Sequence, residues 1–249
     1  MLIKITDRCN MGCNHCMSDC TPNLCDMELK TFEDALAFND KFNKCMPIEI
    51  SGGEPTESVI FKDVIEILIA RYAHWSIPVT VTTNGIWLTT QEELVKQLSK
   101  TMPTLIFQIV VDDRYYPVHV DESSNIFKYG NVKLCRDVLS IYPQGRALTN
   151  NLPSTSLSSR CFNIRALTKQ LNTSDLSAIL TTMNMKGYFC TPHIDIDGNI
   201  KLGESRLCPI CSNIYKKEQE IIDDIINFKC HQCDFINNKL PEKYRRYVE

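Results

Sequence analysis

Short apolar strands that alternate with helical segments restrict the fold of this chain more than any other feature of its sequence. The segment Thr104–Asp113, TLIFQIVVDD, is apolar without a polar alternation, which is typical of a strand in a parallel sheet that is covered on both faces. Further strands are predicted at Leu2–Thr6, Pro47–Ser51 and Ile77–Gly85, and helices from Thr31 to Phe42, at Ser58–Tyr72 and at Thr89–Lys100. Strands separated by helices of this length indicate repeated βα units, so we predict an α/β fold.

The regular pattern weakens after Gly145. Asn150–Arg160 is polar and rich in serine, which predicts a loop. A helix at Leu167–Met185, a hairpin turning at Asp197–Gly198 and a helix near residues 215–228 are predicted beyond it. Cys135 lies in NVKLCRDVLSI, which we interpret as helical. We therefore divide the chain into a βα core at residues 1–160 and a cysteine-bearing extension at residues 161–249.

Charge and hydropathy exclude several classes of function. A formal net charge of -3 argues against a general nucleic-acid or membrane-surface binder. No apolar run reaches the roughly 18 residues of a membrane span, and the first residues lack a signal peptide, so we expect a cytoplasmic protein. The chain nevertheless has 13 cysteines, and in a reducing compartment closely spaced cysteines hold metals or do redox work.

Three cysteines stand close together just after the first predicted strand. The spacing Cys9-x3-Cys13-x2-Cys16 offers three thiolates, whereas a 4Fe–4S cluster normally takes four. One iron would stay open, as one position does in a catalytic zinc site. Cys20 and Cys25 lie nearby, and a zinc knuckle or a set of loop thiols is the alternative interpretation.

This cysteine stretch, CNMGCNHC, resembles the signature of the radical S-adenosylmethionine (SAM) enzymes, with His15 in the aromatic position. Other stretches that match the family in order lie at strand ends or near the fifth strand: SGGEPT (Ser51–Thr56), TTNG (Thr82–Gly85), VVDD (Val110–Asp113) and PQGRA (Pro143–Ala147). The resemblance covers roughly residues 1 to 150 and implies a partial parallel (β/α)6 barrel of the TIM type. Functional groups collect at the carboxyl ends of the strands in such barrels.

The resemblance also implies roles for individual residues. Cys9, Cys13 and Cys16 would hold the catalytic 4Fe–4S cluster, and the amino and carboxylate groups of SAM would chelate the open iron. The expected SAM-binding residues are Gly52, Gly53, Glu54, Pro55, Asn84, Asp112 and Arg146, with Asp113 as a candidate substrate contact. Asn84, Asp112 and Arg146 have capping or turn roles as the alternative. Reductive cleavage of SAM would give a 5′-deoxyadenosyl radical that abstracts a hydrogen atom from the substrate.

A second cysteine group lies in the extension. Its members are Cys190, Cys208, Cys211, Cys230 and Cys233. The two Cys-x2-Cys pairs have the spacing of a zinc ribbon. The segment also resembles the auxiliary-cluster extension, of SPASM or twitch type, of peptide-modifying radical SAM enzymes, although Gly203 stands where that pattern often has a cysteine. We expect one auxiliary centre, a 4Fe–4S cluster with zinc as the alternative, and we also consider His193 and His231 as ligands.

The resulting hypothesis is a radical SAM enzyme that modifies a peptide or protein side chain. Recognition would come from the barrel mouth, the extension or a partner protein, and a flavodoxin or ferredoxin would supply the electrons. One alternative is a small metabolite or nucleotide as the substrate. The other is a zinc-binding interaction protein without catalysis, which offers no reason for SGGEP and VVDD at strand ends.

Overall fold

The structure, a computed structural model, describes residues 1–42, 46–136, 141–142, 144–153, 175–186, 192–203 and 205–228. These ranges contain one sheet of eight strands in the order β5-β4-β3-β2-β1-β6-β7-β8. The strands are β1 (Leu2–Thr6), β2 (Ile48–Gly52), β3 (Val79–Thr83), β4 (Leu105–Val110), β5 (Val132–Cys135), β6 (Pro192–Ile194), β7 (Asn199–Leu202) and β8 (Ile210–Asn213). The helices are α1 (Leu29–Phe42), α2 (Phe61–Tyr72), α3 (Glu92–Thr101), α4 (Gly145–Thr149), α6 (Leu176–Lys186) and α7 (Glu218–Asn227).

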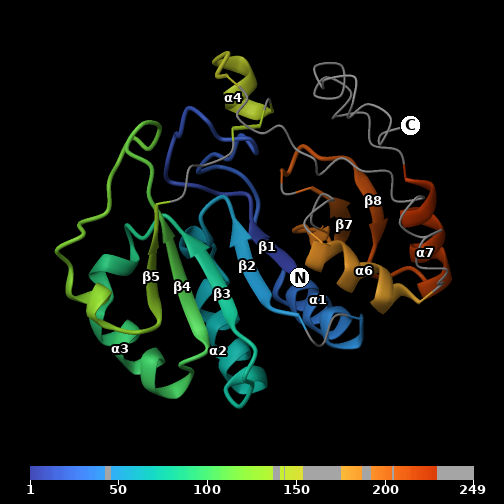
Figure 1. Ribbon diagram of the computed structural model, residues 1–249, viewed down its shortest axis with the longest axis horizontal. Helices are drawn as coiled ribbons and strands as arrows, with labels where there is room; N and C mark the ends of the chain where they lie inside the picture. Colours follow the sequence, from blue (N-terminus) through green and yellow to red (C-terminus); the bar gives the residue numbers. More distant parts are fainter. Residues whose placement is uncertain are drawn as a thin grey trace.

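The strands β1 to β5 are parallel and neighbour one another in chain order, which confirms the α/β fold of the partial barrel type. The sixth parallel strand, β6, pairs with the other edge of β1, where Leu2 lies opposite His193 and Ile3 opposite Ile194. The strands β7 and β8 then continue the sheet antiparallel. The sheet stays open between β5 and β8, at opposite sides of Figure 1. The predicted boundary at residue 160 therefore separates segments that share one sheet.

One face of the sheet packs against the helices and forms the core. In β3 and β4 fully buried residues alternate with half-buried ones, so these strands are more buried on one face than on the other. The side chains of Ile50, Val81 and Phe107 on this face are fully buried and belong to one cluster with those of Phe32 in α1 and Leu68 in α2. The opposite face carries the half-buried Thr80, Thr82 and Gln108. The core thus leaves the more polar face free to line the interior of the partial barrel.

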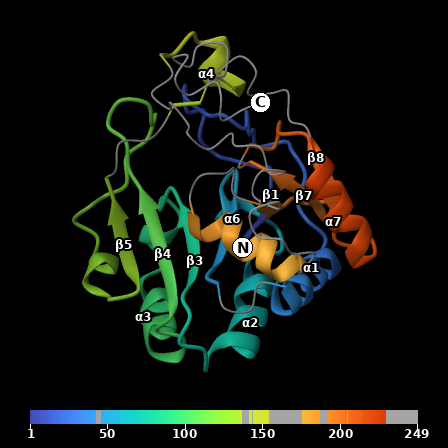
Figure 2. The same ribbon diagram turned by 45° about the vertical axis from the view of Figure 1, so that its right-hand side comes forward.

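The helices also link the two parts of the chain. Helix α6 contacts both α1 and α7, and Figure 2 shows α1 and α6 close to each other. Helix α4 lies at the end of the molecule where β1 to β4 terminate (Figure 1). In the part of the chain that the structure describes, no helix combines the length and the apolar character that crossing a membrane needs.

Two local predictions are wrong and two are confirmed. Residues 132–135 form strand β5 instead of a helix, because pairing with β4 outweighs the helical pattern around Cys135. Helix α1 begins at Leu29, two residues before the predicted start at Thr31. The hairpin of β6 and β7 turns at Asp197–Gly198 as predicted, with Gly198 at a φ of 75° that favours glycine. Helix α7 lies within the helical segment expected near residues 215–228.

Replacement of Phe107 by alanine tests the core. Phe107 is 0% exposed in the centre of β4, so the substitution removes a large apolar side chain and leaves a cavity. We expect the free energy of unfolding, measured by urea denaturation, to fall by about 3–5 kcal/mol. Val59→Ala is the control, since Val59 is 72% exposed and its loss should change that free energy by less than about 0.5 kcal/mol. Equal effects of the two substitutions would contradict this description of the core.

Candidate active site at the carboxyl ends of the strands

The three N-terminal cysteines lie in one loop that leaves the end of β1 and returns to it. This segment, residues 7–26, is named here the cysteine loop. Hydrogen bonds from Asp7 N to Cys25 O (2.9 Å) and from Cys9 N to Thr21 O (3.1 Å) close it. Cys9, Cys13 and Cys16 all line a cavity of about 380 Å³, and their role as cluster ligands stays a prediction. Cys20 lines it as well and packs against Cys9 in a small buried cluster.

The two glycines at the end of β2, Gly52 and Gly53, let the chain pass directly against the start of the cysteine loop. Gly53 N donates to Thr6 O (2.9 Å), and the next amide, that of Glu54, donates to Arg8 O (2.8 Å). A Cβ atom on Gly52 would lie 2.4 Å from Thr6 O, and one on Gly53 would lie 2.2 Å from Arg8 O. Both contacts are shorter than real Cβ atoms make. The glycines are thus needed for backbone pairing with the loop, and their predicted approach to SAM from the same cavity wall stays a prediction.

Glu54 ties the ends of β2 and β3 together. Its side chain is 1% exposed, yet it lines the cavity. The carboxylate accepts hydrogen bonds from Thr83 Oγ1 (2.6 Å), Asn84 N (2.7 Å) and Thr56 Oγ1 (2.7 Å). Burial raises the pKa of Glu54, and these donors oppose that shift. Pro55 follows as the buried first residue of a 3-10 turn, so the stretch GGEP forms one corner of the site.

Asn84 extends this corner toward the cysteine loop. Its Nδ2 donates to Asn10 Oδ1 (2.9 Å), and its Oδ1 accepts from Ile86 N (3.0 Å). Gly85 follows with a φ of 77°, and a Cβ atom there would lie 2.8 Å from a side-chain carbon of Ile109. The structure therefore places Asn84 at the cavity in a turn role, and its contact with SAM stays a prediction.

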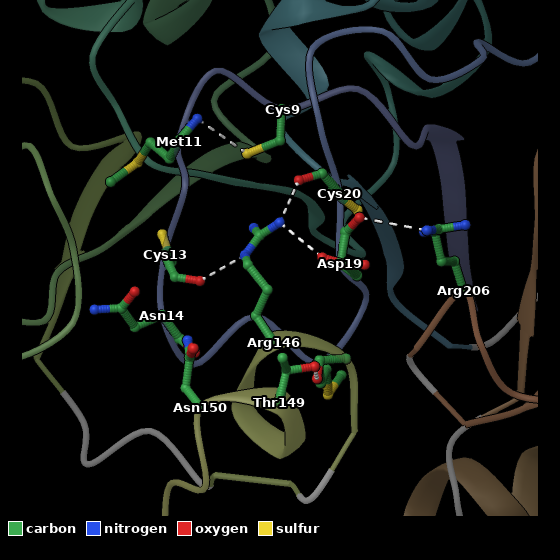
Figure 3. A network of polar contacts seen from close by, with 12 residues as sticks. Cys9, Met11, Cys13, Asn14, Asp19, Cys20, Arg146, Thr149, Asn150 and Arg206 are labelled. Atoms are coloured by element: carbon green, nitrogen blue, oxygen red, sulfur yellow. Dashed lines mark hydrogen bonds and ion pairs between the residues drawn. The ribbon is translucent and has the colours of Figure 1, made fainter.

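Arg146 clamps the cysteine loop from the side of α4. Its Nε donates to Cys13 O (3.0 Å), and its Nη1 donates to Cys20 O (3.0 Å) and pairs with Asp19 Oδ1 (2.9 Å). Figure 3 shows the guanidinium group among these three partners. Gly145 approaches the loop so closely that a Cβ atom there would lie 2.6 Å from Cys16 O. Arg146 lines the cavity, and its Nη2 atom is buried without a hydrogen-bond partner, so this nitrogen is left for an anionic group.

The acidic pair after β4 is arranged differently from the other predicted residues. Asp112 accepts hydrogen bonds from Arg114 N (2.7 Å) and Tyr115 N (3.1 Å) and forms an ion pair with Arg114 at 2.8 Å. Burial raises the pKa of Asp112, but these partners outweigh it and hold the pKa below its ordinary value. The residues described along the cavity wall do not include Asp112 or the exposed Asp113. Asp112 therefore shapes the turn that leads to Tyr116.

Tyr116 is a cavity residue that the sequence analysis missed. Its ring stacks on that of His15 with centroids 5.5 Å apart and an interplanar angle of 18°. Burial raises the pKa of Tyr116 and lowers that of His15, which keeps both side chains uncharged at neutral pH. The Nδ1 atom of His15 is buried without a partner. An aromatic residue shortly after a strand end is the only signal in the sequence, and it is too common to single out Tyr116.

The thiols of the loop differ in their ionisation. Burial raises the pKa of Cys9 to about 11 and that of Cys13 to about 12. A hydrogen bond from the Cys20 thiol, together with the amides of Cys20 and Ser18, instead lowers the pKa of Cys16. Met11 N donates to Cys9 Sγ (3.4 Å). A bound cationic centre favours the thiolate form, so metal binding would release protons from Cys9 and Cys13.

The second cysteine group is described only in part. Cys208 and Cys211 are half-buried near and within β8, whereas Cys190, Cys230 and Cys233 lie outside the described residues, as does His231. No set of three or more His, Cys, Asp or Glu side chains able to hold a single metal ion occurs among the described residues. His193 is fully buried in β6 opposite Leu2, at the end of β1 away from the cysteine loop.

Gly53→Ala tests the close approach of β2 to the cysteine loop. The added methyl group must displace the carbonyl of Arg8, so we expect a loss of about 1–3 kcal/mol in the free energy of unfolding. Iron uptake on anaerobic reconstitution should fall as well, because Cys9 follows Arg8 directly. Gly130→Ala is the control, since nothing lies within 4 Å of its added carbon. Wild-type stability and iron uptake in Gly53→Ala would show that the loop does not depend on this contact.

Alkylation of the reduced, metal-free protein tests the ionisation of the thiols. Only the thiolate reacts, so iodoacetamide at pH 7 should modify Cys16 at least about tenfold faster than Cys9 or Cys13. Peptide mass spectrometry with the exposed Cys25 as an internal reference measures the three rates. Cys20→Ala should slow the reaction of Cys16. Equal rates at the three cysteines would rule out the proposed hydrogen bonding.

Comparison with known proteins agrees with this geometry. The model of the Radical SAM superfamily matches residues 3–116. Two solved structures have similar folds. BtrN in complex with AdoMet and 2-DOIA has a TM-score of 0.57 and 12% sequence identity, and the match covers 99% of this chain and 86% of BtrN. Streptococcus suis SuiB bound to the precursor peptide SuiA has a TM-score of 0.55 and 14% sequence identity, and the match covers 93% of this chain and 69% of SuiB.

One curated relative matches at the sequence level. It is the uncharacterized protein MJ0907 of Methanocaldococcus jannaschii, which is 24% identical over 119 residues. The match covers 47% of this chain and 41% of the relative's length.

Proposed function

Residues 3–116 of this chain belong to the radical SAM superfamily, and on this premise we propose that the protein cleaves SAM reductively and abstracts a hydrogen atom from a peptide or protein side chain. The observation that carries the proposal is the shared cavity. Cys9, Cys13 and Cys16 line it together with the GGE corner and Arg146, although these elements come from three distant parts of the chain. A zinc-binding interaction protein would not need this convergence.

The residues present fit a three-thiolate 4Fe–4S cluster and SAM. The donor set consists of three cysteine sulfurs on one loop that line the same cavity, and a cubane takes each thiolate at a different iron. Two buried nitrogens at the cavity, Arg146 Nη2 and His15 Nδ1, have no protein partner. A carboxylate and a polar group of a ligand would satisfy them. When bound, the cluster supplies the electron that breaks a carbon–sulfur bond of SAM.

The chain itself binds and orients. We assign the SAM carboxylate to Arg146 Nη2, because this buried nitrogen has no protein partner and a charge-assisted hydrogen bond would satisfy it. Glu54 joins the ends of β2 and β3 through Thr83 and Asn84, and because Glu54 lines the same cavity, its carboxylate is a candidate acceptor for the SAM ammonium group. The stacked His15 and Tyr116 form an apolar wall suited to a planar ring. Asp112 positions Tyr116, because its carboxylate holds the amides of Arg114 and Tyr115 in the turn that leads to Tyr116.

A peptide substrate is supported by the extension. The fold covers most of SuiB, which was crystallised with a precursor peptide, and the cysteine-bearing segment continues the barrel sheet through β6. We assign Cys208 and Cys211, with partners from Cys190, Cys230 and Cys233, to one auxiliary 4Fe–4S centre, with zinc as the alternative. A flavodoxin or ferredoxin is the proposed electron donor, and the cytoplasm the proposed compartment. The likeness to BtrN, crystallised in complex with AdoMet and 2-DOIA, favours a small metabolite as the second candidate substrate.

Metal content and SAM cleavage test the core of the proposal. Wild type purified anaerobically should contain about eight irons and eight sulfides, and a Cys9/Cys13/Cys16→Ala variant about four with no release of 5′-deoxyadenosine in the presence of dithionite and SAM. Cys25→Ala is the control and should keep all the iron, because Cys25 is exposed and outside the cavity lining. If the wild type contained four irons and one zinc, and the triple variant contained only the zinc, the zinc would be assigned to the extension. A wild type without iron would refute the radical chemistry.

Deuterium transfer distinguishes the two substrate classes. Extracts of cells grown in deuterated medium are divided into fractions above and below about 1 kDa, and deuterium in the released 5′-deoxyadenosine is measured by mass spectrometry. A peptide or protein substrate predicts label from the larger fraction that is lost after protease treatment. Label from the smaller, protease-resistant fraction would instead favour the metabolite.

A further inference from the structure

A turn of the extension lies directly against the cysteine loop, although nearly 190 residues separate the two in the sequence. Ser205 Oγ donates to Met17 O (2.7 Å), and Arg206 N donates to Ser18 Oγ (3.2 Å). Ser205 and Ser18 are 1% and 6% exposed, so these hydrogen bonds are shielded from water. The turn holds the stretch of the loop between Cys16 and Cys20, which the barrel strands do not reach.

Asp19 lies between two arginines from different parts of the chain (Figure 3). Arg206 Nη2 donates to Asp19 O at 3.3 Å, and Arg146 Nη1 pairs with Asp19 Oδ1 at 2.9 Å. Asp19 has a φ of 52°, a left-handed conformation that a non-glycine residue keeps only where its surroundings hold it. The two arginines are such surroundings. Release of one of them would let the chain relax beside Cys20.

The turn that provides these contacts is itself fixed. Lys201 Nζ donates to Arg206 O (2.7 Å) and forms a buried ion pair with Asp195 at 3.2 Å. Cys208 N donates to Ser205 O (3.0 Å). The same turn therefore joins β7 to Cys208 and reaches the cysteine loop, so a displacement at Cys208 would be transmitted over three residues to Met17 and Ser18.

We infer that Ser205 and Arg206 are positioning residues for the N-terminal cysteine site: they fix residues 17–19 and thereby place the Cys16 sulfur and Cys20. The inference rests on the proposed function and adds a role for the extension in the first site, distinct from holding a second centre or a substrate. In the metal-free protein the contact keeps the Ser18 and Cys20 amides directed at the Cys16 sulfur. In the loaded protein it sets the surroundings of the iron that Cys16 binds.

The test compares Ser205→Ala and Arg206→Ala with the restoring changes Ser205→Thr and Arg206→Lys, which keep a hydroxyl and a cation. The control is Lys216→Ala, which removes an exposed cation of the extension that pairs with Asp224. Three properties are measured: hydrogen exchange of residues 16–21 in the metal-free protein, the EPR spectrum of the reduced N-terminal cluster with and without SAM, and KM and kcat for SAM cleavage.

We expect the two alanine variants to retain the iron of both centres and the thermal melting of the wild type within a few degrees. Exchange at residues 16–21 should be at least threefold faster, the SAM-induced change of the EPR spectrum should be altered, and KM for SAM should rise at least fivefold with a smaller change in kcat. The variants Ser205→Thr and Arg206→Lys should return each of these properties most of the way to its wild-type value. Lys216→Ala should match the wild type in all of them.

Two results would overturn the inference. Wild-type exchange, EPR spectrum and KM in both alanine variants would show that the turn merely packs against the loop. Equal effects in Lys216→Ala would show a general loss of stability. A wild type without iron refutes the proposed function and leaves the exchange measurement to decide whether the turn holds residues 17–19. If Arg206→Ala does not fold, the smaller change Ser205→Ala decides.

Discussion

The site depends on the backbone pairing between the end of β2 and the start of the cysteine loop. Gly52 and Gly53 approach Thr6 and Arg8 so closely that any side chain would have to overlap with a carbonyl oxygen. This contact sets the point where the loop leaves β1 and therefore the position of Cys9. The same corner places Glu54 where it binds the end of β3. Every other element of the cavity is arranged around this pair of strand ends.

A second constraint is the distribution of dipoles in the cysteine loop. Arginine side chains donate hydrogen bonds to three of its backbone carbonyl oxygens. Arg146 donates to those of Cys13 and Cys20, and Arg206 donates to that of Asp19. Amide groups of the same loop point at sulfur, as those of Met11 at Cys9 and of Ser18 and Cys20 at Cys16 do. Carbonyls turned outward to cations and amides turned inward to thiolates suit a site for negatively charged sulfur. The hydrogen bonds of the loop thus direct its amides at the sulfurs of Cys9 and Cys16.

The open sheet explains how one domain can serve two cysteine groups. β6 adds to the free edge of β1, and the antiparallel strands β7 and β8 carry the sheet on to Cys211. Because β1 is also the strand from which the cysteine loop departs, the extension reaches the loop from the side opposite β2. The loop is therefore held by Gly53 and Glu54 on one side and by Ser205 and Arg206 on the other.

The sequence by itself determined the strand and helix order of the core, the spacing of Cys9, Cys13 and Cys16 and the placement of the GGE stretch at a strand end, because these depend on local periodicity and on short-range chemistry. It did not determine strand β5, where pairing with β4 overrides a helical pattern, nor the stacking of His15 on Tyr116. Only the tertiary structure decided that Asp112 serves its own turn while Arg146 reaches the cysteines, and that Ser205 and Arg206 meet Met17–Asp19. Such contacts join residues far apart in the chain, and their formation depends on the register of β6 against β1, for which no local pattern exists.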